Sequence, residues 1–273
     1  MIDTLSKCNN LIISLLPTYI CKALPPQTIT QEHCFSCMRD SFRSPGKDTY
    51  DCMIKLCQYT INFGPIYVSE IYHFLTQSKI LENNFLQLNR PINIMSLGCG
   101  IGVDYMALKK YIFSNELDIE FEYKGYDIEP LWQEITSDTI PNVPIIKDII
   151  NGFDCDTTDI IFMNKVFSTL KNHGLHTDFL STFRDEIENL PVGSFIVFND
   201  VNRFNMGRDD FDNFAQENSL QVIEKYFFNV ENAYSDNYTS IASTHNICNI
   251  PSNLIHAPKP TVNKTVFFLY KKV

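Results

Sequence analysis

The sequence predicts an α/β protein in which a mostly parallel sheet follows a helical N-terminal region. From Asn89 onward, apolar runs of strand length alternate with stretches of helical character, the pattern of parallel strands joined by helices. Residues 1–88 instead carry helical patterns separated by proline and glycine. We therefore expect a helical cap over residues 1–88 and a sheet domain over residues 89–273.

The composition restricts the class of partner. The chain has 273 residues, 44% hydrophobic and 20% charged, which suits one large α/β domain with an appendage. The net charge of −10 and a pI near 5.0 argue against broad binding to nucleic-acid phosphates.

Export and membrane signals are not recognisable in the sequence. Residues 1–7 lack the basic cluster of a signal peptide, and the apolar run over residues 11–23 is too short to span a bilayer and contains Pro17. The odd number of cysteines, nine, indicates reduced thiols rather than a disulfide framework. We expect a cytoplasmic protein without a membrane partner.

Four helices are expected in the N-terminal region. An apolar stripe over residues 11–16 predicts the first, and residues 31–44 predict the second. The third, over residues 48–63, is expected to stop at Gly64-Pro65, because these residues commonly end a helix. The fourth is expected over residues 67–81.

Four cysteines of this region raise the question of a zinc site. Cys34 and Cys37 form a Cys-x-x-Cys pair, and Cys52 and Cys57 follow. Zinc ribbons usually place such pairs on turns flanked by glycine or proline, whereas these cysteines lie within helical patterns. We expect packed thiols on helix faces and assign no metal.

The sheet domain begins with an apolar strand over residues 92–97 that leads directly into Gly98, Gly100 and Gly102. A helical stretch over residues 105–113 follows. Strand, glycine turn and helix form a nucleotide-binding βα unit. Glycine permits a sharp turn and a close approach of ligand to backbone, and the helix offers free N–H groups.

The spacing of the glycines distinguishes between ligands. A dinucleotide-binding loop requires G-x-G-x-x-G, but the third glycine here comes one residue too early, with Val103 after it. A phosphate-binding P-loop requires a Lys-Ser or Lys-Thr pair, which is not present after these glycines. The pattern that remains is G-x-G-x-G after a buried strand.

An acidic residue follows the second predicted strand, over residues 121–126. Asp127 lies at the carboxyl edge of this strand, next to the glycine turn. A ribose diol carries two hydroxyl donors, and a single carboxylate can accept both hydrogen bonds. We interpret Asp127 as a ribose-binding residue.

The next two strands end in further residues that could bind a ligand. The third, over residues 143–146, precedes Asp148, which could accept a hydrogen bond from an adenine amino group, with Ile149 against the ring. The fourth, Asp159 to Met163, is apolar after its first residue, as a central parallel strand should be. It ends at Asn164, at the edge of the sheet where the reacting part of a bound ligand is expected to lie.

The remainder of the chain completes the sheet. A helix is expected over residues 177–190 and a fifth strand over residues 194–198. Two final β-rich runs cover residues 221–228 and 265–270. The polar segment between them, residues 231–260, is a candidate substrate lid, because loops of that length are usually functional or mobile.

These features in this order resemble the class I S-adenosylmethionine-dependent methyltransferases over residues 89–273, most closely members with S-L-G-C-G-x-G-x-D. The resemblance implies a seven-stranded Rossmann-like sheet with helices on both faces, a closing antiparallel pair of strands, and S-adenosylmethionine at its carboxyl edge. Many members carry an acid two residues before the first glycine, where this chain has Ser96, so Asp104 is expected to meet the cofactor's ammonium instead.

The glycines and Cys99 would wrap the methionine part, and Asn164 would lie beside the transferred methyl. The cofactor-binding residues implied are Ser96, Gly98, Cys99, Gly100, Gly102, Asp104, Asp127, Ile128, Asp148, Ile149 and Asn164.

The acceptor is constrained by motifs that the chain lacks. Nucleic-acid amino methyltransferases of this fold carry [DNS]-P-P-[YF] after the fourth strand, whereas this chain has no proline after Asn164. Pyrimidine carbon methylation needs a cysteine nucleophile, and Cys57 lies outside the sheet domain. We predict a small-molecule or protein acceptor, with RNA as the alternative.

No catalytic base is assigned from the sequence. Methyl transfer from a sulfonium mainly requires alignment of the two partners, and a base is needed only when the acceptor must lose a proton. His173, His176 and Asp200 are candidates near the site edge, but a loop histidine is more often a solvated surface residue. Two other functions stay open: a nicotinamide-dependent oxidoreductase, and a non-catalytic binding or scaffold protein with the same fold.

Overall fold

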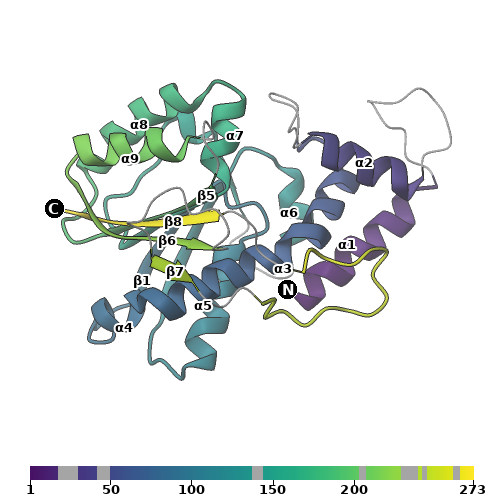
Figure 1. Cartoon of the computed structure of the whole chain (residues 1–273), viewed down its shortest axis with the longest axis horizontal. Coiled ribbons are helices and arrows are strands. Elements are labelled where there is room, and N and C mark those ends of the chain that lie inside the picture. The colour runs from purple at the N-terminus through teal and green to yellow at the C-terminus, as the bar shows by residue number, and fades with distance from the viewer. Residues whose placement is uncertain are drawn as a thin grey trace.

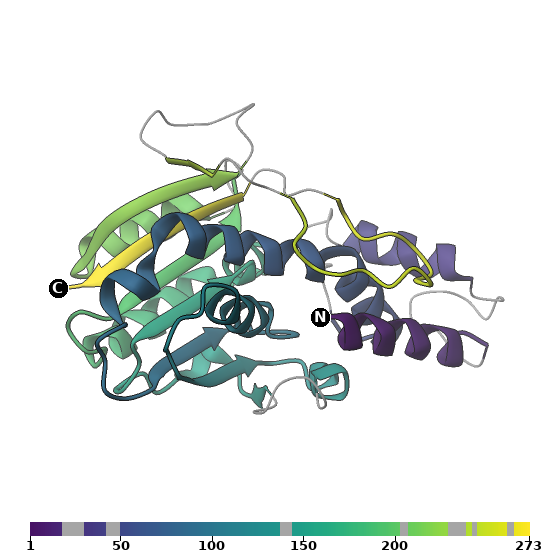
Figure 2. The same ribbon diagram turned by 90° about the horizontal axis from the view of Figure 1, so that it is seen from below.

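The protein is built around one mixed sheet with helices on both faces, as the computed structural model shows (Figure 1 and Figure 2). The structure describes residues 1–17, 30–41, 50–136, 144–202, 207–228, 239–241, 245–260 and 265–273. Within this part of the chain, no helix is both long and apolar enough to cross a membrane.

The sheet has the strand order β3-β2-β1-β4-β5-β8-β6-β7. Strands β1 to β5 are parallel, and β8 is inserted antiparallel between β5 and β6. The first seven strands of this order confirm the predicted sheet and its closing antiparallel pair, and the short β7 adds an eighth strand beside β6. The strands are β1 (Ile92–Leu97), β2 (Phe121–Asp127), β3 (Ile145–Ile146), β4 (Ile160–Asn164), β5 (Phe195–Val201), β6 (Leu220–Phe228), β7 (Thr239–Ile241) and β8 (Thr265–Lys272).

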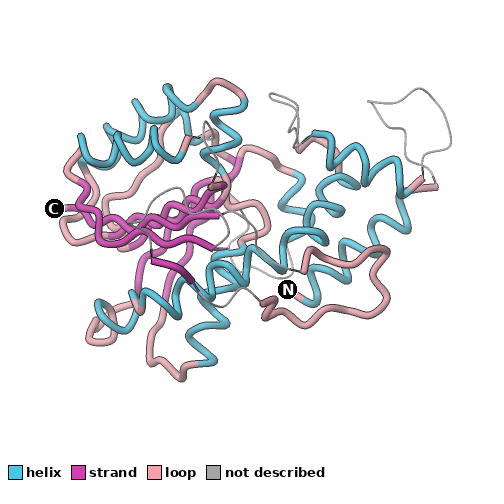
Figure 3. Tube along the Cα trace, in the orientation of Figure 1, coloured by secondary structure: helices cyan, strands magenta, loops and turns pink. Residues whose placement is uncertain are grey.

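The helices cover the two faces of the sheet (Figure 3). Along β4, alternate side chains enter different cores: Ile160 and Phe162 pack with α3 and α5, and Ile161 packs with α8 and α9. This alternation places one core on each side of the sheet. The helices are α1 (Ile2–Leu15), α2 (Gln31–Ser41), α3 (Met53–Ser78), α4 (Ile80–Asn84), α5 (Val103–Ser114), α6 (Leu131–Thr136), α7 (Val166–Asn172), α8 (His176–Glu188) and α9 (Arg208–Glu217).

Helix α3 is much longer than the sequence predicts, and the expected stop at Gly64-Pro65 is wrong. Proline removes one backbone hydrogen bond from the helix interior. The residues beyond it nevertheless bury an apolar face on the sheet, where the ring of Phe74 stacks on Phe267 with centroids 4.7 Å apart. The Ser69 hydroxyl also donates to the Pro65 carbonyl at 2.7 Å. Burial over several turns outweighs the single lost bond, so α3 joins two predicted helices into one.

Residues 245–260 form a strap across the N-terminal helices rather than a cover over a ligand site (Figure 1, yellow-green loop below α1). Asn9 of α1 accepts a hydrogen bond from the Ile255 amide at 2.9 Å. The Ile247 amide donates to the Ser69 hydroxyl at 3.0 Å, and the Lys259 amide donates to the Asn62 carbonyl at 2.9 Å. Residues 245–260 of the predicted lid therefore hold α1 and α3 together, whereas its residues 239–241 form strand β7 beside β6.

Some predicted boundaries lie outside the described residues. These are the start of the third strand at residue 143, the end of the second helix at residues 42–44, the start of the third helix at residues 48–49, and residues 231–238 and 242–244 of the polar segment.

Candidate functional site

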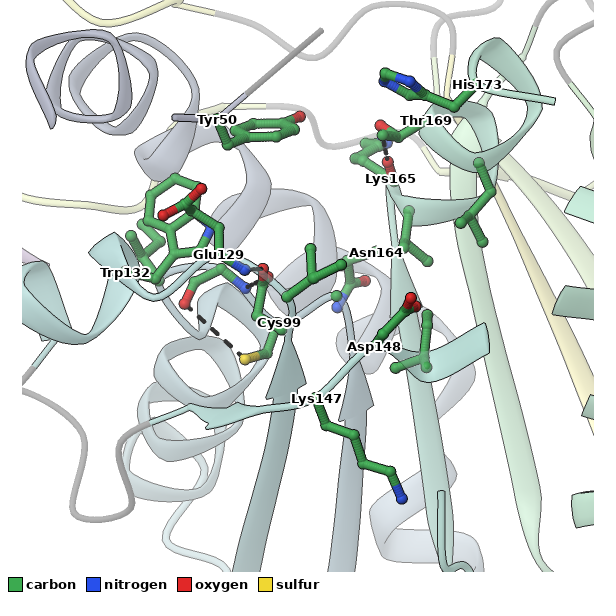
Figure 4. Close-up of a pocket in the computed structure, with 18 of the residues that line it drawn as sticks. Tyr50, Cys99, Glu129, Trp132, Lys147, Asp148, Asn164, Lys165, Thr169 and His173 are labelled. Carbon is green, nitrogen blue, oxygen red and sulfur yellow. Dashed lines mark hydrogen bonds between the residues drawn. The ribbon is translucent and has the colours of Figure 1, made fainter. Parts of the chain in front are cut away.

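A cavity of about 440 Å³ opens at the carboxyl edge of β1, β2, β3 and β4 (Figure 4). The turns after these strands line it together with residues of α3, α6 and α7, and Figure 4 shows Trp132 of α6 and Thr169 of α7 on opposite sides. Its size lies in the usual range for small-molecule sites.

Eight of the predicted cofactor-binding residues line this cavity, and three do not. The strand-end turns bring together residues that are far apart in the sequence, as expected for a parallel sheet. Gly98, Cys99, Gly100, Asp127, Ile128, Asp148, Ile149 and Asn164 line the cavity, whereas Ser96, Gly102 and Asp104 do not.

The glycine turn requires left-handed backbone at each of its glycines, with φ of +66° at Gly98, +50° at Gly100 and +68° at Gly102. A Cβ at Gly98 would lie 2.6 Å from a methyl carbon of Val166, so this glycine also permits close packing of α7. A Cβ at Gly100 would meet only the Trp132 ring, at 3.6 Å. The turn thus exposes main chain to the cavity at Gly100.

Asp127 is joined directly to this turn. Its Oδ2 accepts a hydrogen bond from the Gly100 amide at 2.8 Å, and its Oδ1 accepts one from the Glu129 amide at 3.0 Å. Burial raises the pKa of Asp127 to about 6, although the two backbone hydrogen bonds act in the opposite direction. Each carboxylate oxygen retains a further lone pair, so the group can still accept hydroxyl donors from a ligand.

Asp148 and Ile149 lie at the next strand end. The Asp148 carboxylate caps a short 3₁₀ turn (Ile149–Asn151), accepting from the Ile150 amide at 3.0 Å. Ile128 exposes 64% of its surface beside the cavity, whereas Ile149 is buried. These two side chains give apolar surface next to the Asp148 oxygens, which suits a flat ring with an amino group.

Asn164 ends β4 at the centre of the site, between the glycine turn and α7 (Figure 4). In the described part of the chain, neither atom of its side-chain amide has a hydrogen-bond partner, although both atoms are buried. Buried polar groups are normally paired, so an unpaired amide at a cavity wall indicates a polar ligand there.

Ser96 and Asp104 lie behind the glycine turn and are fully buried. The Asp104 Oδ1 accepts hydrogen bonds from the Tyr123 hydroxyl at 2.9 Å and the Tyr105 amide at 3.1 Å. Burial raises the pKa of Asp104. The first turn of α5 directs this side chain toward β2, away from the cavity. The structure therefore places Ser96, Gly102 and Asp104 outside the cavity lining, and the contact of Asp104 with the cofactor's ammonium stays a prediction.

An aromatic wall that sequence reasoning missed faces the strand ends. Tyr59 and Tyr67 come from α3, Tyr50 from the segment before α3, and Trp132 from α6. The Tyr50 ring centre lies 5.7 Å from that of Tyr59 and 6.0 Å from that of Trp132. The spacing of Tyr59, Phe63 and Tyr67 fits one helix face, but the expected stop at Gly64-Pro65 concealed it.

A buried ion pair lies next to the Tyr67 ring of this wall. The Lys165 ammonium is 2.8 Å from the Glu70 carboxylate and donates to Asn199 Oδ1 at 2.7 Å. It also lies 5.3 Å from the centre of the Tyr67 ring. Lys165 has a left-handed backbone with φ of +59°, directly after Asn164. The pair joins α3, β4 and β5 at one point.

The three candidate bases have different environments. His173 lines the cavity, whereas His176 does not. Asp200 is buried and accepts hydrogen bonds from the Ser168 amide at 2.8 Å and the Val201 amide at 2.7 Å. Burial raises the pKa of Asp200, with the Lys165 charge opposing that shift. Only His173 is placed where it could contact a ligand.

Among the cysteines that the structure describes, Cys99 lines the cavity, and its thiol is a poor nucleophile. Burial holds the pKa of the Cys99 thiol well above its usual value, with Asp127 and Asp104 adding to the shift. Across the described ranges, no group of three or more histidine, cysteine, aspartate or glutamate side chains is placed to hold a metal ion.

Comparison with known proteins gives matches in structure only. No family model and no curated protein sequence matches the chain. The plantazolicin methyltransferase BpumL, in complex with a pentazolic desmethylPZN analogue and SAH, is 13% identical with a TM-score of 0.50, covering 89% of this chain and 96% of that one. The magnesium protoporphyrin IX methyltransferase ChlM from Synechocystis, with bound SAM, is 11% identical with a TM-score of 0.47, covering 93% of this chain and all of that one. Together with its strand order, the likeness to BpumL shows that this chain has the fold of the class I S-adenosylmethionine-dependent methyltransferases.

Proposed function

We propose that this protein binds S-adenosylmethionine in the cavity and transfers its methyl group to a small-molecule or protein acceptor. One observation carries the proposal: the left-handed glycine turn and the Asp127 carboxylate lie on the same cavity wall and are joined by the Gly100 hydrogen bond of 2.8 Å. Exposed main chain beside a carboxylate suits a nucleoside with an amino-acid tail. The BpumL structure of the same fold holds SAH, which supports the choice of ligand.

Each lining residue has a role in this proposal. Asp127 would accept the ribose hydroxyls, and Asp148 with Ile128 and Ile149 would surround the adenine. The main chain of Gly98 to Gly100 would lie against the methionine part, and the Asn164 amide would bind a polar group near the methyl. Sulfonium methyl transfer is an in-line displacement, so the contribution of these residues is orientation and exclusion of water.

The size of the cavity, about 440 Å³, favours a small molecule or a short protein segment as acceptor. The aromatic wall on α3 and α6 faces the strand ends, and the net charge of −10 disfavours a long nucleic acid. We propose the cytoplasm as the compartment.

Thermal unfolding with a panel of nucleotides tests this function. S-adenosylhomocysteine and S-adenosylmethionine should raise the melting temperature, because a ligand at a hundred times its dissociation constant adds about 2.7 kcal/mol to stability. NAD and ATP serve as controls and should have no effect. Stabilisation by NAD alone would favour an oxidoreductase, and no response to any of these ligands would favour a non-catalytic scaffold.

A further inference from the structure

We infer that the methyl acceptor presents an amine nitrogen, which is held at the aromatic wall formed by Tyr50, Tyr59, Tyr67 and Trp132. This inference rests on the proposed function and specifies its substrate class. Three properties of the cavity support it: the clustering of electron-rich rings, the balance of nearby charge, and the direction in which charge moves during the reaction.

The rings are gathered on one side of the cavity and in contact with one another. Tyr59 lies 5.7 Å from Tyr50, 6.2 Å from Tyr67 and 6.3 Å from Trp132, measured between ring centres. Figure 4 shows Tyr50 between the side that carries Trp132 and the side that carries His173. A cation is attracted to the faces of such rings, most strongly to tryptophan and tyrosine, and more so where water is excluded.

The charges near this wall are predominantly acidic. Glu129 lines the cavity beside Trp132 (Figure 4), and Asp51 follows Tyr50. Asp51 is 3.5 Å from the Lys55 ammonium and exposes 60% of its side chain. Its negative charge is therefore screened more than that of Glu129 and attracts a cation at the wall less strongly. Glu129 is half-buried, and one of its oxygens accepts the Leu131 amide at 3.0 Å, so the carboxylate is held in place.

The two lysines of the lining do not offset this acidity. The Lys165 ammonium is bound by Glu70 at 2.8 Å and by Asn199 at 2.7 Å, so its charge is neutralised within the protein. Lys147 points away from the other labelled residues in Figure 4, and its ammonium lies 5.8 Å from the centre of the Tyr126 ring. An anionic acceptor at the aromatic wall would therefore meet one ammonium already bound within the protein and one that points away from the site.

The reaction itself moves positive charge toward this wall. The acceptor nitrogen forms the new N–C bond with its lone pair, while the C–S bond breaks and its electron pair stays on sulfur. Sulfur thereby becomes neutral and the nitrogen becomes positive. A primary or secondary amine then releases one proton to water. The rings of the wall and the Glu129 carboxylate would stabilise the positive charge that develops on an acceptor nitrogen held there, and such stabilisation accelerates the transfer.

The test uses the only tryptophan of the chain, Trp132, as a fluorescent reporter within the wall. The protein, saturated with S-adenosylhomocysteine, is titrated with choline, with its neutral isostere 3,3-dimethylbutan-1-ol, and with the anion 3,3-dimethylbutanoate. We expect choline to bind at least about tenfold more tightly than the neutral isostere, a difference equal to about 1.4 kcal/mol. The anion should bind most weakly.

Two variants assign the preference to the wall. Tyr50→Leu should remove most of the preference for choline, whereas Tyr50→Phe, which retains the ring, should keep it. Tyr72→Leu is the matched control, because Tyr72 lies on α3 outside the cavity and packs on Tyr111 with ring centres 5.5 Å apart. Equal binding of choline and its neutral isostere, or preference for the anion, would overturn the inference. Failure of S-adenosylhomocysteine to bind at all would instead contradict the proposed function.

Discussion

The Lys165 ammonium lies 2.8 Å from the Glu70 carboxylate, and both side chains are almost fully buried. Asn199 closes the group, accepting from Lys165 at 2.7 Å and donating to Glu70 at 3.2 Å. Lys165 follows Asn164 directly, so this ion pair ties α3 to the strand end where methyl transfer is proposed to occur. This one buried ion pair therefore fixes the position of α3 relative to the end of β4.

Removal of both partners of this pair should cost less free energy of unfolding than the two single removals added together. Glu70→Gln or Lys165→Met leaves an unpaired buried charge, and breaking such a pair costs about 3–5 kcal/mol. The double variant should lose less than the sum of the single variants by about 0.5–3 kcal/mol. Urea denaturation of the four proteins measures this coupling. Strictly additive losses would show that the pair does not stabilise the fold as a unit.

Affinity for S-adenosylhomocysteine should fall below pH 6. Burial raises the pKa of Asp127 to about 6, so the carboxylate that accepts the ribose hydroxyls becomes protonated in that range. For a single titrating group, affinity should drop about tenfold between pH 7 and pH 5. Asp127→Asn should bind weakly and show a flat pH profile, which calorimetry at several pH values would measure. A wild-type profile as flat as that of the variant would contradict this role.

The same group should affect the stability of the unliganded protein in the opposite direction. The pKa of Asp127 is higher in the folded state than the ordinary value of 3.8, so folding favours its neutral form. Its contribution to the free energy of unfolding is therefore fully present below pH 3.8 and is lost as the pH rises through 6. A comparison of wild type with Asp127→Asn in urea at pH 5 and pH 7 isolates this effect.

Alanine at the first two glycines of the turn should affect stability unequally. Both positions have left-handed backbone, which costs about 1–2 kcal/mol for a residue with a Cβ. Gly98→Ala adds an overlap with Val166 at 2.6 Å, whereas Gly100→Ala meets Trp132 at an ordinary 3.6 Å. Gly98→Ala should therefore have the lower urea midpoint, and Gly100→Ala should mainly weaken ligand binding. Equal urea midpoints for the two variants would show that α7 moves away from the added methyl group at little cost in free energy.

Asn9→Ala should loosen the strap over residues 245–260. The buried Asn9 side chain accepts from the Ile255 amide at 2.9 Å and donates to the Asn253 carbonyl at 3.4 Å. Loss of these bonds should reduce stability by about 1–3 kcal/mol and speed hydrogen exchange at the Ile255 amide. Asn10→Ala, at the adjacent exposed position, is the control. Unchanged exchange at Ile255 would show that other contacts hold the strap.

Local sequence patterns were sufficient for the sheet and for one wall of the site. A buried parallel strand is an apolar run, and it ends where polar residues or glycine begin, so β1, β2 and β4 with Gly98, Asp127 and Asn164 at their ends could be predicted. The strand ends then meet at one edge because the strands are parallel.

The other wall depends on tertiary packing and was not accessible from local patterns. Gly64-Pro65 is a local stop signal, and only burial on the sheet carries α3 through it. Tyr59 and Tyr67 share one helix face only because of this continuity. The direction of Asp104 likewise depends on how α5 packs on β2. The division of the chain after residue 88 stays a prediction.

Calorimetric titration of S-adenosylhomocysteine into the wild type, Asp127→Ala and Glu122→Ala tests the central claim most directly. Glu122 is an exposed acid on the same strand as Asp127, outside this cavity, and serves as the matched control. The proposal predicts one saturable site per chain in the wild type and in Glu122→Ala, and an affinity about tenfold or more lower in Asp127→Ala. No binding heat in the wild type, or equal affinity in all three proteins, would contradict it.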